Sequence, residues 1–267
     1  MPGVRAWLAD YPYTCVEQLS AKALGLRDPV AWEALMQRLP GYLDAHGLAA
    51  YFPGGTGSVA LTAHLLSITA EARALGWPYE LPVALRERMV AALQDFVLGR
   101  IESPAWAPVR DEAWRKVIAI EALARNGGYR PGMLDSIDLH VADWPSPALV
   151  DWLSILRHAP GIDRHAKRLA EVKALLRGRL ARHGTTLVLN DPTADSGWWL
   201  MSSAEGTQAR LIMALLGEAD WREDLPRLAM GLVGMQRQGA WPTTTSNALG
   251  TLAMARFAQA FEQQAGE

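Results

Sequence analysis

The segment KVIAIEALARNGG (residues 116–128) is apolar over a wide face of a helix and ends at a basic residue and glycine. Four further segments have the same character: LTAHLLSITAEARALG (61–76), LVDWLSILRHAPG (149–161), TQARLIMALLGEAD (207–220) and NALGTLAMARFAQAF (247–261). A helix that is apolar over most of its circumference must be covered on nearly all sides. The sequence therefore predicts a set of buried helices that pack against one another.

More amphipathic helices lie between the buried ones. LPVALRERMVAALQDFVLG (81–99) and RHAKRLAEVKALLRGRLARHG (164–184) carry charged residues on one side, and that side must face water. Alternation of a buried helix with a half-exposed one is what a ring of helical hairpins requires. The spacing of the repeats is uneven, which favours a closed ring over an open solenoid. We predict an all-α fold, an α/α toroid, formed by one domain over residues 1–267.

Helical periodicity predicts roughly ten to twelve helices, given a typical length of about a dozen residues. The candidate segments are 16–25, 29–39, 58–75, 82–99, 111–126, 146–158, 161–182, 205–217, 223–236 and 245–263. Ser58 and Ser146 are predicted N-caps, and residues 187–189 are the one candidate strand. Glycine follows the last apolar residue of three helices, at Gly76, Gly127 and Gly217.

Composition excludes several classes of protein. The 28 acidic and 26 basic residues give a net charge of −2 without long runs of either sign, so we expect neither nucleic acid nor an anionic membrane as partner. No uncharged apolar stretch reaches the about 18 residues of a membrane span, so no membrane insertion is expected. The chain has one cysteine, which excludes an internal disulfide.

That cysteine lies in YPYTCVEQ (residues 11–18), three positions before a glutamine at the start of a predicted helix. Residues three apart share a helix face, so the Cys15 thiol and the Gln18 carboxamide can meet. The sulfur can attack the amide carbon and expel ammonia, which leaves an internal thioester. Water would hydrolyse such a bond, so Tyr11 and Tyr13 are candidates to shield it. The amide-rich helix start is expected to lower the pKa of the thiol.

YPYTCVEQ resembles the thioester motif of the α2-macroglobulin and complement superfamily, and looks closest to the bacterial α2-macroglobulins. Three other segments are similar to that family and extend the likeness over nearly the whole chain: GGTGSVALTAHLL (54–66), SGWWLMSSAEGTQARLIMALL (196–216) and GAWPTTTSNALGTLAMARF (239–257). Carried over by position, Cys15 supplies the sulfur, Gln18 supplies the acyl carbon, and Glu17 completes the motif. Thr14 and Val16 replace the glycines that are usual in the animal proteins.

The resemblance implies the thioester domain of a protease inhibitor, excised from a larger multidomain protein. A protease cuts a bait segment elsewhere, and one of its lysine amines then attacks the Gln18 carbonyl. Such a domain is a single-use covalent module and not an enzyme, and it needs no cofactor or metal. Its implied partners are target proteases and neighbouring domains, and its implied location is periplasmic or secreted.

Some relatives use a histidine to direct transfer to hydroxyls. WAPVRDEAW (106–114), aligned loosely with that region, offers Arg110 and Asp111 instead. If the alignment holds, these two residues modulate transfer, and attack by lysine amines is favoured over esterification.

The alternative is a toroidal enzyme in which Cys15 is only a buried hydrophobe. LVGMQRQGAW (232–241) fits a motif of triterpene cyclases, but the Asp-rich acid cluster of those enzymes is missing, so Gln236 and Trp241 are interpreted as packing residues. The six histidines do not pair with Cys15 at a recognisable zinc spacing. A glycosidase would need two carboxylates across a cleft. The candidates are Asp111, Glu112, Asp143, Asp191 and Asp195, of which Asp111, Glu112 and Asp191 are more simply explained as helix or turn caps.

Overall fold

The computed structural model describes residues 1–102, 111–191 and 194–265, and the side chains of these residues except at 194–196 and 262–265. The described residues form eleven α-helices and one two-stranded antiparallel sheet. The elements are α1 (Pro2–Asp10), α2 (Val16–Leu26), α3 (Pro29–Arg38), α4 (Val59–Ala74), α5 (Val83–Val97), α6 (Glu112–Arg125), α7 (Ser146–His158), α8 (His165–Gly178), β1 (Leu180–His183), β2 (Thr186–Leu189), α9 (Ala204–Leu215), α10 (Leu225–Gly234) and α11 (Thr244–Ala265).

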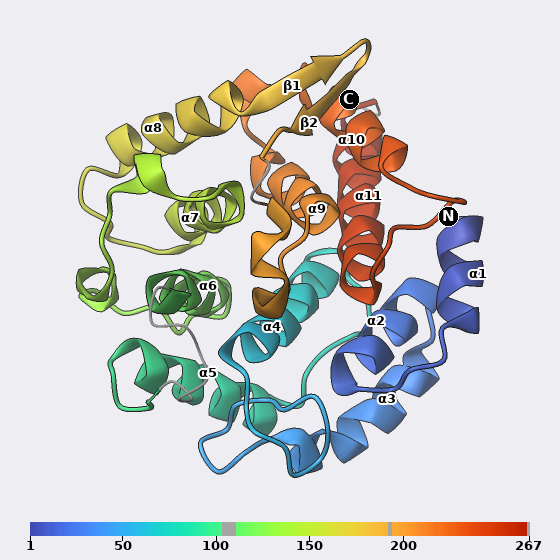
Figure 1. Cartoon of the computed structure of the whole chain (residues 1–267), viewed down its shortest axis with the longest axis vertical. Helices are drawn as coiled ribbons and strands as arrows, with labels where there is room; N and C mark the ends of the chain where they lie inside the picture. Colours follow the sequence, from blue (N-terminus) through green and yellow to red (C-terminus); the bar gives the residue numbers. More distant parts are fainter. Residues whose placement is uncertain (103–110, 192–193, 266–267) are drawn as a thin grey trace.

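Six of these helices close a ring: α2, α4, α6, α7, α9 and α11. Each packs against the next in this order, and α11 packs back against α2. Helices α3, α5, α8 and α10 lie on the outside, against α2, α6, α7 and α9 respectively (Figure 1). The predicted all-α toroid is therefore confirmed.

Burial follows this division between inner and outer helices. In the inner helix α7 every residue from Ser146 to Leu156 is buried, whereas in the outer helix α8 only Val172 and Leu176 are buried. The charged residues of α8 face solvent, as its amphipathic pattern predicts. The apolar content of each helix thus reports its place in the ring.

Several helix ends agree with the prediction. The Ser58 hydroxyl accepts a hydrogen bond from the Leu61 N–H at 3.3 Å and caps α4. All three predicted glycines follow their helices with φ between +70° and +89°, a conformation that suits glycine: Gly76, Gly127 and Gly217. Residues 187–189 lie in β2, as predicted.

Two predictions of local structure were wrong, and one helix was missed. Ser146 is the first residue of α7 and not its cap, because the carboxylate of Asp191 accepts its N–H at 2.8 Å. The predicted helix 161–182 begins at His165 and ends at Gly178, because the chain then pairs as β1 with β2. Helix α1 was not predicted at all.

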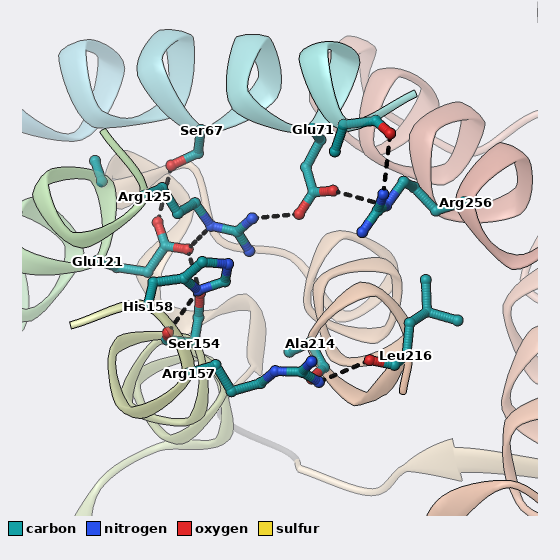
Figure 2. A network of polar contacts seen from close by, with 12 residues as sticks. Ser67, Glu71, Glu121, Arg125, Ser154, Arg157, His158, Ala214, Leu216 and Arg256 are labelled. Carbon is teal, nitrogen blue, oxygen red and sulfur yellow. Dashed lines mark hydrogen bonds and ion pairs between the residues drawn. The ribbon is translucent and has the colours of Figure 1, made fainter. Parts of the chain in front are cut away.

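A buried ion network joins the inner helices toward one end of the ring (Figure 2). Arg125 of α6 pairs with Glu121 on its own helix and with Glu71 of α4, and its side chain is only 10% exposed. Glu121 also accepts hydrogen bonds from Ser67 of α4 at 2.8 Å and from Ser154 of α7 at 2.7 Å. Burial alone would lower the pKa of Arg125, but the two carboxylates outweigh it and raise that pKa, so the guanidinium stays charged. The network therefore fixes three neighbouring inner helices against one another.

Replacing Arg125 by methionine should leave the Glu71 and Glu121 carboxylates buried without their principal cation. We expect Arg125→Met to lower the free energy of unfolding by about 3 kcal/mol, measured by urea denaturation. The control Arg100→Met removes a 67%-exposed partner of Asp95, and should cost less than about 1 kcal/mol. Equal losses in the two variants would contradict the role given to the network.

Candidate functional site

Cys15 is the N-cap residue of α2 and is 5% exposed. Its backbone N–H donates to Oε1 of Gln18 at 3.0 Å, while its sulfur caps the Gln18 backbone amide. Gln18 is the third residue of the helix, so the pair forms a reciprocal capping box. The structure thus brings the thiol and the carboxamide together at the start of one helix.

Burial raises the pKa of the Cys15 thiol, and nearby Glu17 adds to the rise. Hydrogen bonds from the backbone amides of residues 17 and 18 oppose it but do not overcome it. The expected net lowering of the thiol pKa by the helix start is therefore wrong, because desolvation is the larger effect. The site keeps sulfur in its neutral form and excludes water from it.

Glu17 lies between the two residues of this pair in the sequence, and its side chain holds α2 to α11. Its carboxylate is 6% exposed and accepts hydrogen bonds from the hydroxyls of Thr244 at 2.8 Å and Thr245 at 2.9 Å. Burial raises the pKa of Glu17, and the two hydroxyls only partly offset it. The motif is therefore anchored to the first turn of α11.

The aromatic residues before the motif form a small stack. The rings of Trp7 and Tyr11 stack at a centroid distance of 4.8 Å, and Tyr13 meets Tyr11 edge-on at 5.6 Å. Burial, and then the neighbouring Glu17 and Cys15, raise the pKa of Tyr11, while a hydrogen bond with Gln18 opposes the rise. Tyr13 is 64% exposed. Of the two tyrosines, Tyr11 is thus the one that contacts the motif.

Two groups at this site were not identified from the sequence. The carbonyl of Tyr51 accepts the N–H of Val16 at 3.0 Å, and burial together with Glu17 and Cys15 raises the pKa of the Tyr51 phenol to about 12. Thr244 and Thr245 belong to AWPTTT (240–245), a segment that indicated from the sequence only a packing tryptophan and a likeness to the family. No spacing rule connects either group to Cys15, because the contacts span long stretches of chain.

The two predicted transfer-modulating residues fare differently. Arg110 lies outside the described residues. Asp111 immediately precedes α6, is 8% exposed, and accepts a hydrogen bond from Nε1 of Trp199 at 3.0 Å. Asp111 thus ties the start of α6 to the segment before α9.

Several residues of the alternative enzyme make structural contacts in this fold. Trp241 is fully buried and donates to the Leu232 carbonyl at 2.8 Å. Asp191 caps α7, and Glu112 pairs with Lys116 at 3.1 Å. The side chain of Asp195 lies outside the described residues. In the part of the chain that the structure describes, no three His, Cys, Asp or Glu side chains are grouped so as to hold a metal ion.

Known structures share this fold at low sequence identity. Native α2-macroglobulin from Escherichia coli, from domain MG7 to the C-terminus, is 20% identical with a TM-score of 0.69, over 96% of this chain and 41% of that one. E. coli α2-macroglobulin activated by porcine elastase is 19% identical with a TM-score of 0.66, over 93% and 23%. Salmonella α2-macroglobulin reacted with methylamine is 18% identical with a TM-score of 0.65, over 94% and 17%.

The chain therefore spans less than half the length of each of these proteins. Comparison with protein-family models and with curated proteins gives no match. Among the described residues, no helix is both long and apolar enough to cross a bilayer. The likeness to solved structures establishes the fold.

The raised pKa of Glu17 has a consequence for stability. Its ionised form favours the unfolded chain, so this destabilisation is absent at low pH and grows as pH rises above about 4.3, the ordinary value for glutamate. Glu17→Gln should lie within about 1 kcal/mol of wild type near pH 4 and gain stability relative to it toward pH 7. Urea denaturation across that range measures the difference.

The control for this measurement is Glu33→Gln, on the exposed surface of α3. This substitution should change the free energy of unfolding by no more than about 0.5 kcal/mol at either pH. A constant difference between wild type and Glu17→Gln across the range would mean that the carboxylate does not titrate as its burial requires.

Proposed function

We propose that this chain is the thioester domain of a bacterial α2-macroglobulin-like protease inhibitor. The observation that supports this most directly is the capping box, which holds a buried thiol beside a carboxamide at the first turn of α2. The shared fold supports it independently of the motif. On this proposal residues 1–267 form one domain of a longer protein, in the periplasm or secreted.

The bond forms by attack of the Cys15 sulfur on the side-chain carbonyl carbon of Gln18. The C–N bond of the carboxamide breaks, the amide nitrogen leaves as ammonia with the thiol proton, and a thioester joins the two side chains. The capping box places the two groups within one helical turn before the reaction. No oxidant or metal is required.

Burial then protects the product. A thiolate leaves more readily when the pKa of its thiol is low, and burial raises the pKa of the Cys15 thiol. Exclusion of water removes the competing nucleophile. Both effects would weaken together if the cover over Cys15 moved, so one rearrangement would both expose and activate the acyl group.

Capture is the last step. An unprotonated lysine amine of the protease attacks the Gln18 carbonyl, an isopeptide bond forms, the C–S bond breaks, and Cys15 regains a proton as a free thiol. The backbone amides at the start of α2 are suited to stabilise negative charge that develops on the carbonyl oxygen. The bait segment and the trigger belong to other domains of the proposed full-length protein.

Intact mass and peptide mapping of the freshly purified chain test the proposal. We expect a mass lower than that of the sequence by one ammonia, and one methylamine adduct with release of one titratable thiol after treatment. The methylamine-reacted Salmonella structure makes this reagent a natural probe. Cys15→Ala and Gln18→Glu should show neither the deficit nor the adduct, whereas Gln37→Glu, on the exposed surface of α3, should show both.

Peptide mapping also separates a lost bond from one that never formed. Hydrolysis of a thioester converts Gln18 to a glutamate, whereas an unreacted chain keeps its carboxamide. A free Cys15 beside an unmodified Gln18 in every molecule would contradict the proposal and favour the toroidal enzyme instead.

The shielding role divides the two tyrosines. Since Tyr11 contacts Gln18 and lies in the aromatic stack, Tyr11→Ala should accelerate methylamine-induced thiol release at least several-fold. Tyr13→Ala, which removes a 64%-exposed ring, should have a smaller effect. A thiol-reactive dye follows both rates, and equal rates for the two variants would show that Tyr11 is not the shield.

A further inference from the structure

A second polar site lies well away from Cys15, toward the end of the ring where the C-terminal ends of α4, α6, α7 and α9 meet (Figure 2). A cavity of about 140 Å³ opens there. We call it the arginine pocket and define it by the residues that dominate its wall: Glu71, Arg125, Arg157, His158 and Arg256. These side chains come from α4, α6, α7 and α11, so four inner helices contribute to one small space.

The wall of the pocket has an excess of positive charge. Four arginines and one glutamate line it, which gives a formal charge of +3, the fourth arginine being Arg73. Glu121 and Glu218 pair with Arg125 and Arg157 but do not line the cavity. Glu80, which also lies outside the wall, pairs with Arg73 at 3.8 Å, so the three outer carboxylates balance the charge and the excess is confined to the wall itself.

The only carboxylate in the wall is already committed. One oxygen of Glu71 pairs with Nη1 of Arg125, and the other lies 3.3 Å from Nε of Arg256. Nε of Arg256 is buried, and no described acceptor forms a hydrogen bond of good geometry with it. Each guanidinium has five N–H donors in a planar fork, so the pocket holds more donors than its own acceptors satisfy.

Arg157 and Arg256 also donate hydrogen bonds to backbone carbonyls, each at a different helix end. Arg157 donates through Nη1 to the carbonyls of Ala214 and Leu216 at the end of α9. Arg256 donates to the carbonyl of Ala74 at 3.3 Å. Figure 2 shows Arg125, His158 and Arg256 on one side of a common space, with Arg157 across from them. The carbonyls at the helix ends thus accept hydrogen bonds from only some of the N–H groups of Arg157 and Arg256, and the remaining N–H groups can bind a ligand.

We propose that the arginine pocket binds a small oxyanion, a carboxylate or a phosphate group. A water molecule occupies about 30 Å³ of the liquid, so the cavity has room for roughly four or five waters, which suits such a group. Guanidinium forks match the oxygen spacing of both groups. A bound oxyanion would accept hydrogen bonds from guanidinium donors of the wall that the carboxylate and the helix-end carbonyls do not use. This proposal is independent of the thioester.

Isothermal titration of the full chain, with inorganic phosphate and with acetate at constant ionic strength in chloride, tests the proposal. We expect saturable binding of one equivalent of phosphate, acetate or both. Arg256→Gln should weaken it about tenfold or more, because a charged hydrogen-bond donor is lost. The control Arg227→Gln removes an arginine of α10 that pairs with Asp224 at 3.8 Å, and should leave binding unchanged.

A second variant keeps every charged residue of the arginine pocket and reduces only the volume of its cavity. Ala70 lines the pocket, so Ala70→Leu should abolish binding while the ion pairs around Glu71 remain. Binding of phosphate alone would identify a tetrahedral anion as ligand, and binding of acetate alone would identify a carboxylate. Absence of saturable binding by wild type, or equal binding by wild type and Ala70→Leu, would overturn the proposal.

Discussion

The buried pairing of Arg125 with Glu71 and Glu121 is the constraint on which the ring depends. The C-terminal ends of α4, α6, α7 and α9 gather at one end of the ring, where their dipoles favour cations. Two arginines supply these cations. Arg157 donates to the carbonyls at the end of α9, and Arg256 donates to a carbonyl at the end of α4. Arg125 is the most buried of these arginines, and its charge is offset by the two carboxylates that pair with it. The network thereby sets how the inner helices register against one another.

The opposite end of the ring has the opposite polarity. Helix N-termini gather there, and unpaired backbone amides favour negative charge. The buried acidic groups found there are consistent with this, with Glu17 at the start of α2 and Asp111 before α6. Yet burial at Cys15 outweighs the amides and raises its pKa. On the proposed function, the same end would favour an oxyanion on Gln18 during acyl transfer, while it keeps the resting sulfur uncharged.

Periodicity was enough to predict the toroid, because each inner helix must bury its whole circumference and each outer helix one face. Periodicity could not predict which side chains from distant segments of the chain would be in contact. Glu121 and Arg125 are four apart and could be read as a pair, but nothing in the sequence places Glu71 beside them. Ser146 was predicted as a cap because a nearby hydroxyl is the usual solution, yet the actual cap comes from Asp191. The same limit hid the threonine partners of Glu17, while the local spacing was enough to predict the proximity of Cys15 and Gln18.

On the proposed function, the attachments of α2 bear on how the buried acyl group would be exposed. Its first turn is held on two sides, by the Tyr51 carbonyl at Val16 and by two hydroxyls of α11 at Glu17. Moving α2 would break both contacts and open the ring between α2 and α11. The aromatic stack is held differently, through ring contacts among Trp7, Tyr11 and Tyr13 and one bond from Lys22 to the Tyr11 carbonyl at 2.7 Å. The contacts of the stack are separate from the two that hold the first turn of α2, so the segment before Cys15 and the helix that carries the motif are attached independently.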